Sequence, residues 1–180
     1  MEEFYRLKVA GLERDLPICK LNDKISIAGF VIFGDVELTV ACARELVKKI
    51  PEHDIILTAE SKGIPLAYEM ARQMNEGYLL ARKGVKVYMK DPVGVEVQSI
   101  TTKKLQTLYL DKTDAEKIKG KRVVIVDDVI STGESLKALE TLVEKLGGNI
   151  VGKMAILAEG DAFDRDDLIT LAPLPLIMND

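Results

Sequence analysis

The chain has 180 residues, of which 47% are hydrophobic and 30% are charged, a balance typical of one globular domain. Its 25 basic and 29 acidic residues give a net charge of −4, which excludes a general basic surface for nucleic acid, so any phosphate would have to be bound locally. No apolar stretch approaches the roughly 20 residues that span a bilayer, the amino end carries Glu2 and Glu3 instead of a basic leader, and the two cysteines lack metal-ligand spacing. We therefore expect a soluble, cytoplasmic protein with reduced thiols and no membrane partner.

The first half of the chain alternates between strand and helix patterns. Apolar residues alternate with polar ones in two runs within 5–18, which predicts a pair of strands. Asp35 precedes apolar residues at helical spacing up to residue 50, which predicts a capped helix. A buried strand is predicted over 55–58, and a second helix over 67–74.

The second half continues this alternation. Short strands are predicted at 78–81, 85–88, 108–110, 123–126 and 150–157. The segment 91–104, rich in glycine, threonine and lysine, is typical of a mobile connection, and an apolar stripe from Leu136 to Leu146 predicts a helix that ends at a double glycine. Strands that alternate with helices indicate an α/β fold with a right-handed, mostly parallel central sheet flanked by helices.

Two adjacent carboxylates follow the most strongly apolar of these strands. The run Val123 to Val126 is β-branched without polar alternation, which suits a strand covered on both faces. Asp127 and Asp128 then lie at its carboxyl end, the edge where open α/β sheets bind ligands. Paired carboxylates there can accept hydrogen bonds from neighbouring hydroxyls, such as the 2′ and 3′ hydroxyls of a ribose.

A hydroxyl-bearing loop follows the two acids and leads into a helix. It consists of Ser131, Thr132, Gly133, Glu134 and Ser135. Free amides and hydroxyls at a helix start can bind a phosphate, and because the lysine of a Walker loop is missing, a phosphate monoester is expected instead of a triphosphate. An ordinary strand, turn and helix with capping hydroxyls is the alternative, but such a turn would not require the paired acids.

A similar turn occurs earlier in the chain, after the strand at 55–58. Glu60, Ser61, Lys62 and Gly63 separate this strand from a helix that carries Pro65 in its first turn. Parallel strands would place both turns at one edge of the sheet, within reach of a ligand with phosphates at either end. Taken alone, the segment is also consistent with a capped helix and a solvated lysine.

The segment VVIVDDVISTGES resembles the phosphoribosyl-pyrophosphate (PRPP) signature of the type I phosphoribosyltransferases, and the chain from about 25 to 160 is similar to their adenine phosphoribosyltransferase-like branch. The resemblance implies one domain over 1–180, with a core at about 34–157, a small hood over the base from 1–33 and 158–180, and a mobile lid at about 90–106. Glu134 stands where these enzymes often have glycine, and we expect its carboxylate to point out of the loop.

The resemblance also implies roles for particular residues. Asp127 and Asp128 would hold the ribose hydroxyls, residues 131–135 the 5′-phosphate, and Glu60, Ser61, Lys62 and Gly63 the pyrophosphate. A cis peptide bond often occurs in the pyrophosphate loop of this family, which makes Ser61-Lys62 the candidate bond.

Basic and hydroxyl residues elsewhere fit the same substrate. Arg82 and Lys83 would neutralise the pyrophosphate, although surface solvation would explain them equally well. Because related enzymes can donate one member of such a pair across a dimer interface, a homodimer is expected. In the lid, Thr101, Thr102 and Lys103 would close over the pyrophosphate, and Lys103 would act in catalysis; a plain surface loop is the alternative.

The expected activity is transfer of 5-phosphoribose from PRPP to a purine base, with adenine favoured and pyrophosphate released. Ile130 and Asp161 are the expected base contacts, and Mg²⁺ would be held mainly by the substrate, without a dedicated protein site. The lid lacks the Glu-Tyr-Gly motif of the well-known adenine enzymes, so xanthine, hypoxanthine or a pyrimidine remain alternatives. A regulator that binds PRPP without turnover is another, although the acidic net charge and the absence of a clear helix-turn-helix pattern argue against binding to DNA.

Overall fold

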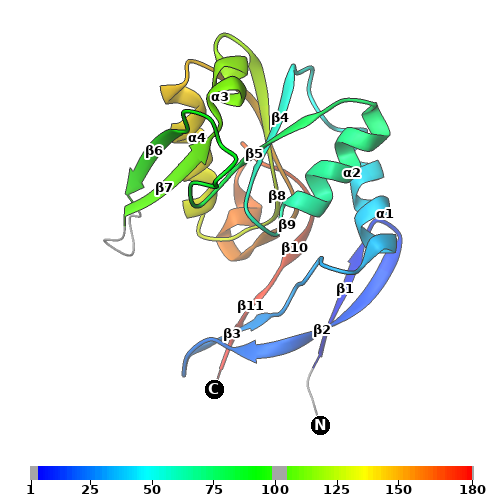
Figure 1. Ribbon diagram of the computed structural model, residues 1–180. Coiled ribbons are helices and arrows are strands. Elements are labelled where there is room, and N and C mark those ends of the chain that lie inside the picture. The colour runs from blue at the N-terminus through cyan, green and yellow to red at the C-terminus, as the bar shows by residue number, and fades with distance from the viewer. Residues whose placement is uncertain (1–3, 99–104, 180) are drawn as a thin grey trace.

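The computed structural model describes residues 4–98 and 105–179. Its centre is a five-stranded sheet in the order β10-β9-β8-β4-β5, and every neighbouring pair is parallel (Figure 1). These strands are β4 (Ile55–Ala59), β5 (Tyr78–Ala81), β8 (Arg122–Ile130), β9 (Asn149–Glu159) and β10 (Ile169–Leu174). The predicted α/β class and parallel sheet are confirmed.

Strand β8 is buried on both faces because helices cover the sheet from both sides. Val124 and Val126 pack with α1 (Val36–Val47) and α2 (Ile64–Met74). Val123 and Ile125 pack on the other side, with α3 (Lys112–Ile118) and α4 (Glu134–Lys145). Successive strand residues face opposite sides of the sheet, so a continuous apolar run is what two covered faces require.

The helix starts follow local capping chemistry. The Asp35 carboxylate accepts a hydrogen bond from the amide of Leu38 at 3.1 Å, which confirms the predicted start of α1. Asp111 caps α3 in the same way through the amide of Thr113. Helix α3 was not predicted from the sequence, because seven residues hold too little periodic pattern.

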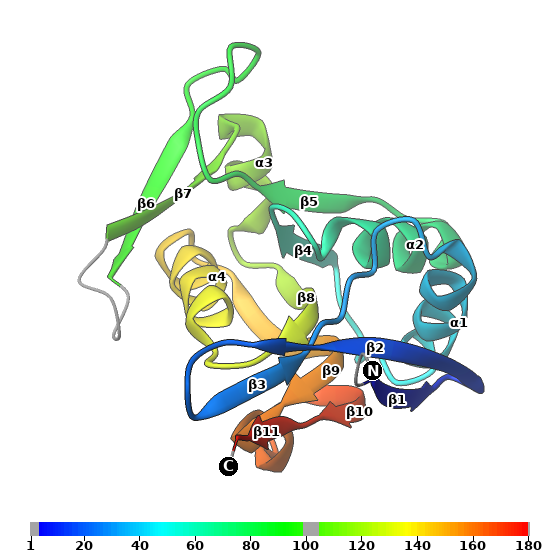
Figure 2. The same ribbon diagram turned by 90° about the horizontal axis from the view of Figure 1, so that it is seen from below.

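A second, antiparallel sheet forms the hood, in the order β1-β2-β3-β11 (Figure 2). It contains β1 (Phe4–Val9), β2 (Leu12–Lys20), β3 (Ile25–Ala28) and β11 (Leu176–Met178). The predicted strand pair near the amino end is β1 and β2. The carboxyl-terminal segment expected in the hood is divided: after a short 3-10 helix (Gly160–Asp164), β10 joins the edge of the central sheet, and only β11 joins the hood sheet.

The segment between β5 and α3 differs most from expectation. Residues 85–88 were predicted as a strand but form a turn in which Val87 is fully exposed, because the strand partner beyond β5 is Tyr109, which bridges to Arg82. The predicted connection at 91–104 contains β6 (Val93–Gln98), which pairs with β7 (Leu105–Leu110). Val95, Leu108 and Leu110 anchor this hairpin in the core beside α4.

Among the described residues, none of the helices combines the length and the apolar character needed to cross a bilayer.

Candidate active site

Two acidic residues occupy the last part of β8, at the carboxyl edge of the sheet. Asp127 pairs in register with Ala155 of β9, and its Oδ1 accepts a hydrogen bond from the amide of Asp128 at 2.9 Å. Asp128 is only 4% exposed. In the part of the chain that the structure describes, its Oδ2 has no hydrogen-bond partner, which is unusual for a buried polar atom and indicates a place for a ligand.

Burial favours the neutral form of both carboxyl groups. The pKa of Asp127 is raised to about 7, mainly because the group is buried and secondly because the charge of Asp128 lies nearby. Burial also raises the pKa of Asp128, although the hydrogen bond to Asp127 and the charge of Lys62 oppose the rise. A hydroxyl-rich or cationic ligand would reverse this balance by stabilising the charged form.

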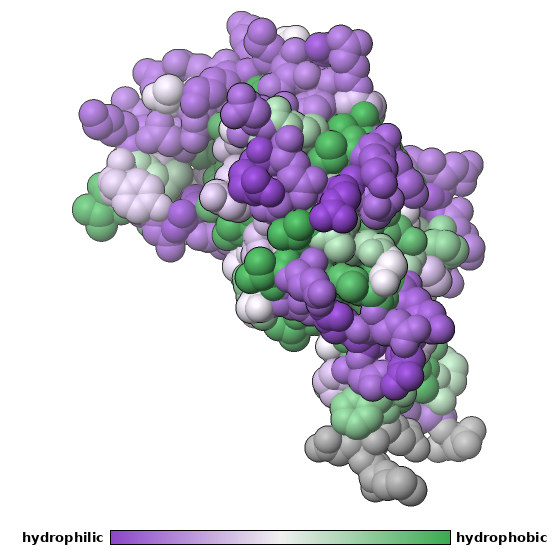
Figure 3. Space-filling model, turned by 90° about the vertical axis from the view of Figure 1, so that its right-hand side faces the viewer, coloured by the Kyte–Doolittle hydropathy of each residue, from purple (hydrophilic) through white to green (hydrophobic). Residues whose placement is uncertain are grey.

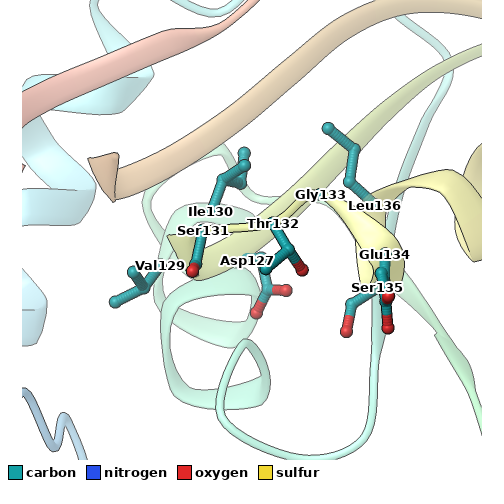
Figure 4. A pocket seen from close by; sticks show the side chains of 9 residues that line it. All are labelled: Asp127, Val129, Ile130, Ser131, Thr132, Gly133, Glu134, Ser135 and Leu136. Carbon is teal, nitrogen blue, oxygen red and sulfur yellow. The ribbon is translucent and has the colours of Figure 1, made fainter. Parts of the chain in front are cut away.

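The loop that follows β8 surrounds a cavity of about 90 Å³ (Figure 4). Gly133 has a φ of +80°, a conformation that favours glycine, and its carbonyl accepts from the amide of Lys137 in α4. Figure 4 shows the side-chain oxygens on one side of the loop, whereas Ile130 and Leu136 extend to the other. The cavity is lined by Asp127, Val129, Ile130, Ser131, Thr132, Gly133, Glu134, Ser135 and Leu136.

Glu134 does not point out of the loop as expected. It lines the cavity, and its carboxylate lies on the same side as the hydroxyl of Ser135 (Figure 4). As the first residue of α4 it lies at the positive end of the helix, which favours a carboxylate in the first turn on either side of the loop, so the dipole alone does not decide its direction.

The second predicted turn packs against the acidic end of β8 at Gly63. A Cβ atom on Gly63 would overlap Thr58 Oγ1 and lie 3.0 Å from Asp127 Oδ1, so only glycine lets this turn approach β8 so closely. Thr58 Oγ1 is another buried polar atom without a hydrogen-bond partner among the described residues. The two predicted anion sites therefore lie at one edge of the sheet, as expected from the strand order.

The cis peptide bond in this turn is Glu60-Ser61, one position before the predicted Ser61-Lys62. The chain leaves β4 at Ala59, so the change of direction comes at the first residue after the strand. Ser61 and Lys62 are exposed beyond it.

Arg82 and Lys83 are both tied to Glu60, in different ways. The guanidinium of Arg82 forms an ion pair with Glu60 at 2.5 Å and lies 5.8 Å from the ring centroid of Tyr88. The amide of Lys83 donates to the other oxygen of Glu60 at 2.9 Å, while its side chain is exposed and its charge opposes the raised pKa of Asp127. The charge of Arg82 is therefore already compensated by Glu60. Of the two adjacent basic residues, Lys83 is the one whose ammonium group is exposed.

A second hollow adjoins the loop on the side of the hood. It is lined by Ser131, Thr132, Glu159, Asp161, Ala162, Arg165 and Leu176. Asp161, the expected base contact, is thus placed beside the loop, and Ile130 is buried next to it at 3% exposure. Sequence reasoning missed Glu159 and Arg165; the position of Glu159 at the end of β9, next to β8, was the available signal.

Thr101, Thr102 and Lys103 lie outside the described residues, so their expected role stays a prediction. Within 4–98 and 105–179, no group of three or more histidine, cysteine or acidic side chains is arranged to hold a metal ion.

Comparison with known proteins identifies the class. Residues 35–167 match the phosphoribosyl transferase domain family, and the chain belongs to this family. The match covers four of the five strands of the central sheet, the turns at 60–63 and 131–135, and Arg165, but not β10.

Particular relatives fall into two kinds. The chain is 34% identical over 124 residues to the adenine phosphoribosyltransferase of Kosmotoga olearia, covering 69% of each protein. It is 30% identical over 129 residues to the purine biosynthesis transcriptional repressor PurR of Bacillus subtilis, covering 70% of this chain but only 44% of the repressor. The crystal structure of adenine phosphoribosyltransferase from Thermoanaerobacter pseudethanolicus shares the fold, with a TM-score of 0.65 at 23% identity over 79% of this chain and 84% of that one. The predicted family and branch are confirmed.

Proposed function

We propose that this protein is a phosphoribosyltransferase that transfers 5-phosphoribose from PRPP to a purine base, with adenine favoured, and releases pyrophosphate. The observation that carries the proposal is the contact between the turn after β4 and the acidic end of β8, where Gly63 packs against Asp127. With the loop at 131–135 following β8 on the same sheet edge, this contact supports a site for a ribose with a phosphate at one end and a pyrophosphate at the other. The adenine enzymes among the relatives support the choice of base.

Placement and charge stabilisation would carry the chemistry. Asp127 and Asp128 would accept hydrogen bonds from the ribose hydroxyls and stabilise positive charge that develops at C1′ as the pyrophosphate leaves. Residues 131–135 would hold the 5′-phosphate, and Lys62, Lys83 and Lys103 would stabilise the leaving group. Glu60 would hold Arg82 in place through their ion pair.

The acidic pair also fits Mg²⁺. Both residues offer oxygen ligands, and Asp128 Oδ2 is buried without a hydrogen-bond partner in the described ranges, so this pair would approach a magnesium ion carried in by the substrate. The ion would neutralise charge on the departing pyrophosphate.

The test is a panel of bases. Purified protein is incubated with PRPP and Mg²⁺ plus adenine, hypoxanthine, guanine, xanthine or a pyrimidine, and pyrophosphate release is measured. We expect pyrophosphate release with a purine, fastest with adenine. The double variant Asp127→Ala and Asp128→Ala should release none, and cooperative unfolding of this variant would show that it is still folded. Release by this double variant at the normal rate would contradict the assignment of the site.

The second candidate is a regulator that binds PRPP without turnover, and the similarity to the repressor favours it specifically. The same experiment separates the two, because PRPP binding without pyrophosphate release for any base would support the regulator.

We further propose a cytoplasmic homodimer. The side of the molecule shown in Figure 3 carries apolar surface among charged side chains. An apolar groove runs between α1 and α2, and the large apolar side chains that line it and are exposed by more than half are Val36 and Tyr68. Apolar surface gathered in this way is typical of a protein interface, and a second copy of the chain would cover it.

A further inference from the structure

Arg165 is held in a fixed position beside the phosphate loop. It follows the 3-10 helix after β9, and its Nε and Nη2 donate to the two carboxylate oxygens of Asp167 at 2.9 Å and 2.8 Å. This bidentate pair uses two of the three guanidinium nitrogens and fixes the plane of the group.

The pair is anchored to α4 through two more charges. Lys153 of β9 donates to Asp167 at 2.9 Å and also pairs with Glu140, a residue of α4 that is only 8% exposed. The hydrogen bonds from Arg165 and Lys153 hold the pKa of Asp167 well below its usual range, so its carboxylate stays charged near neutral pH. Arg165 is thereby positioned relative to the helix whose first turn forms the loop.

The third nitrogen faces the loop. Nη1 of Arg165 lies 3.1 Å from the point where a Cβ atom of Gly133 would stand, and among the described residues it has no hydrogen-bond acceptor. Arg165 also lines the hollow that contains Ser131 and Thr132. An oriented donor therefore lies at the rim of the loop.

The loop needs such a cation. Residues 131–135 contain no basic side chain, and the cavity that they line also borders Asp127 of β8. A phosphate monoester carries close to two negative charges at neutral pH, and the positive end of one helix supplies only about half a charge. Arg82 is already paired with Glu60 in the other turn.

We propose that Arg165 binds the 5′-phosphate of the substrate, with Nη1 donating to a phosphate oxygen, and that Asp167 and Lys153 are positioning residues for it. The inference rests on the proposed function only in that the loop must bind a sugar phosphate; it does not require turnover.

The test compares ligands with and without the phosphate. Binding of ribose 5-phosphate, AMP and adenosine is measured by calorimetry for the wild-type chain, Arg165→Gln and Arg165→Lys. We expect Arg165→Gln to weaken ribose 5-phosphate and AMP by about 10- to 100-fold, as for the loss of a charge-assisted hydrogen bond, and to change adenosine by less than about 2-fold. Arg165→Lys should recover part of the loss, because it keeps the charge without the bidentate geometry. Asp167→Asn should give a smaller loss than Arg165→Gln.

Arg6→Gln is the matched control. Arg6 makes the same bidentate contact, with Asp15, on the hood strands β1 and β2, and it should leave all three affinities unchanged. If wild-type protein binds ribose 5-phosphate and Arg165→Gln binds it equally well, the inference is wrong and the proposed function stands. If Arg165→Gln weakens the binding of AMP and adenosine equally, Arg165 only stabilises the structure of the loop, and the inference is also wrong. If wild-type protein binds neither PRPP nor ribose 5-phosphate, the proposed function itself fails.

Discussion

Asp127 is a carboxyl group whose surroundings favour its protonated form. Because its pKa is raised to about 7, the folded chain binds more protons than the unfolded chain between about pH 4 and pH 7, so the free energy of unfolding should fall as pH rises through this window. Asp127→Asn keeps a side-chain oxygen that can accept the hydrogen bond from the amide of Asp128, but it removes the titrating carboxyl group. We expect this variant to match the wild type at pH 4 and to exceed its stability by about 1–3 kcal/mol at pH 8, after allowance for partial solvent exposure.

The measurement is thermal or urea unfolding of the ligand-free protein at both pH values. Asp164→Asn, a change at an exposed carboxylate, serves as the control and should follow the wild type throughout. A variant Asp127→Asn that is less stable than the wild type at pH 8 would show that the charged form is favoured.

Glu134 lines the place where the 5′-phosphate would bind. A carboxylate and a phosphate a few ångströms apart repel each other, so Glu134→Gln should tighten binding of ribose 5-phosphate by about 3- to 10-fold at low ionic strength. Titration at two salt concentrations checks this, because the gain should shrink at high salt. Weaker binding by Glu134→Gln would instead mean that this carboxylate contributes to the site.

Gly63 lets the turn after β4 pack against the end of β8. In Gly63→Ala the new methyl group would overlap Thr58 Oγ1 and press on Asp127, so we expect a loss of about 1–3 kcal/mol in stability together with weaker PRPP binding. Gly77→Ala is the matched control, since a Cβ atom there meets nothing within 4 Å and no unusual φ is involved. Urea unfolding and PRPP titration of both variants test the contact, and equal behaviour of the two would contradict it.

At the scale of elements, Asp35 joins the hood to helix α1. Its carboxylate caps the helix and also accepts from Arg14 of β2 at 2.7 Å, a half-buried pair that lowers the pKa of Asp35. Asp35→Ala removes both interactions and should cost about 1–3 kcal/mol, whereas Asp35→Asn keeps the cap and should cost less. The ion pair stabilises the fold above the usual carboxyl pKa and is lost as pH falls below it.

Urea midpoints at pH 7 test this ranking. Arg14→Gln should cost at least as much as Asp35→Asn, because it removes the pair with Asp35 and also the pair with Glu37 at 2.7 Å. If Asp35→Asn is as damaging as Asp35→Ala, the charge and not the cap dominates.

Elements that local pattern specifies were predicted, and those that need a distant partner were not. The strand before Asp127 and the helix after Asp35 carry their own periodicity and caps. The segment 85–88 alternates like a strand, but no strand lies beside it, because Tyr109 takes the pairing position next to Arg82. Strands β10 and β11 are short, and only their partners, β9 and β3, assign them to different sheets.

At the scale of the whole molecule, the apolar groove between α1 and α2 leads us to expect a dimer. Sedimentation velocity at micromolar concentration should give twice the mass of the 180-residue chain. Val36→Glu, at a residue 72% exposed beside the groove, should shift the protein to monomer without unfolding it. Val87→Glu, the same substitution at an exposed valine outside the groove, should leave the dimer intact. A monomeric wild type would contradict the proposal.

The sequence by itself determined the α/β class, the acidic pair at the end of β8 and the two turns that resemble anion sites, because strand burial, helix capping and glycine turns depend on residues close together in the chain. Only the tertiary structure decided that Gly63 touches Asp127, that Arg82 pairs with Glu60 and that Arg165 lies over Gly133. That Glu134 lines the cavity was likewise visible only in the tertiary structure, because the helix dipole accommodates a carboxylate on either side of the loop. Such contacts join residues far apart in sequence, and they follow from strand order and from the burial of charges, which no local pattern encodes.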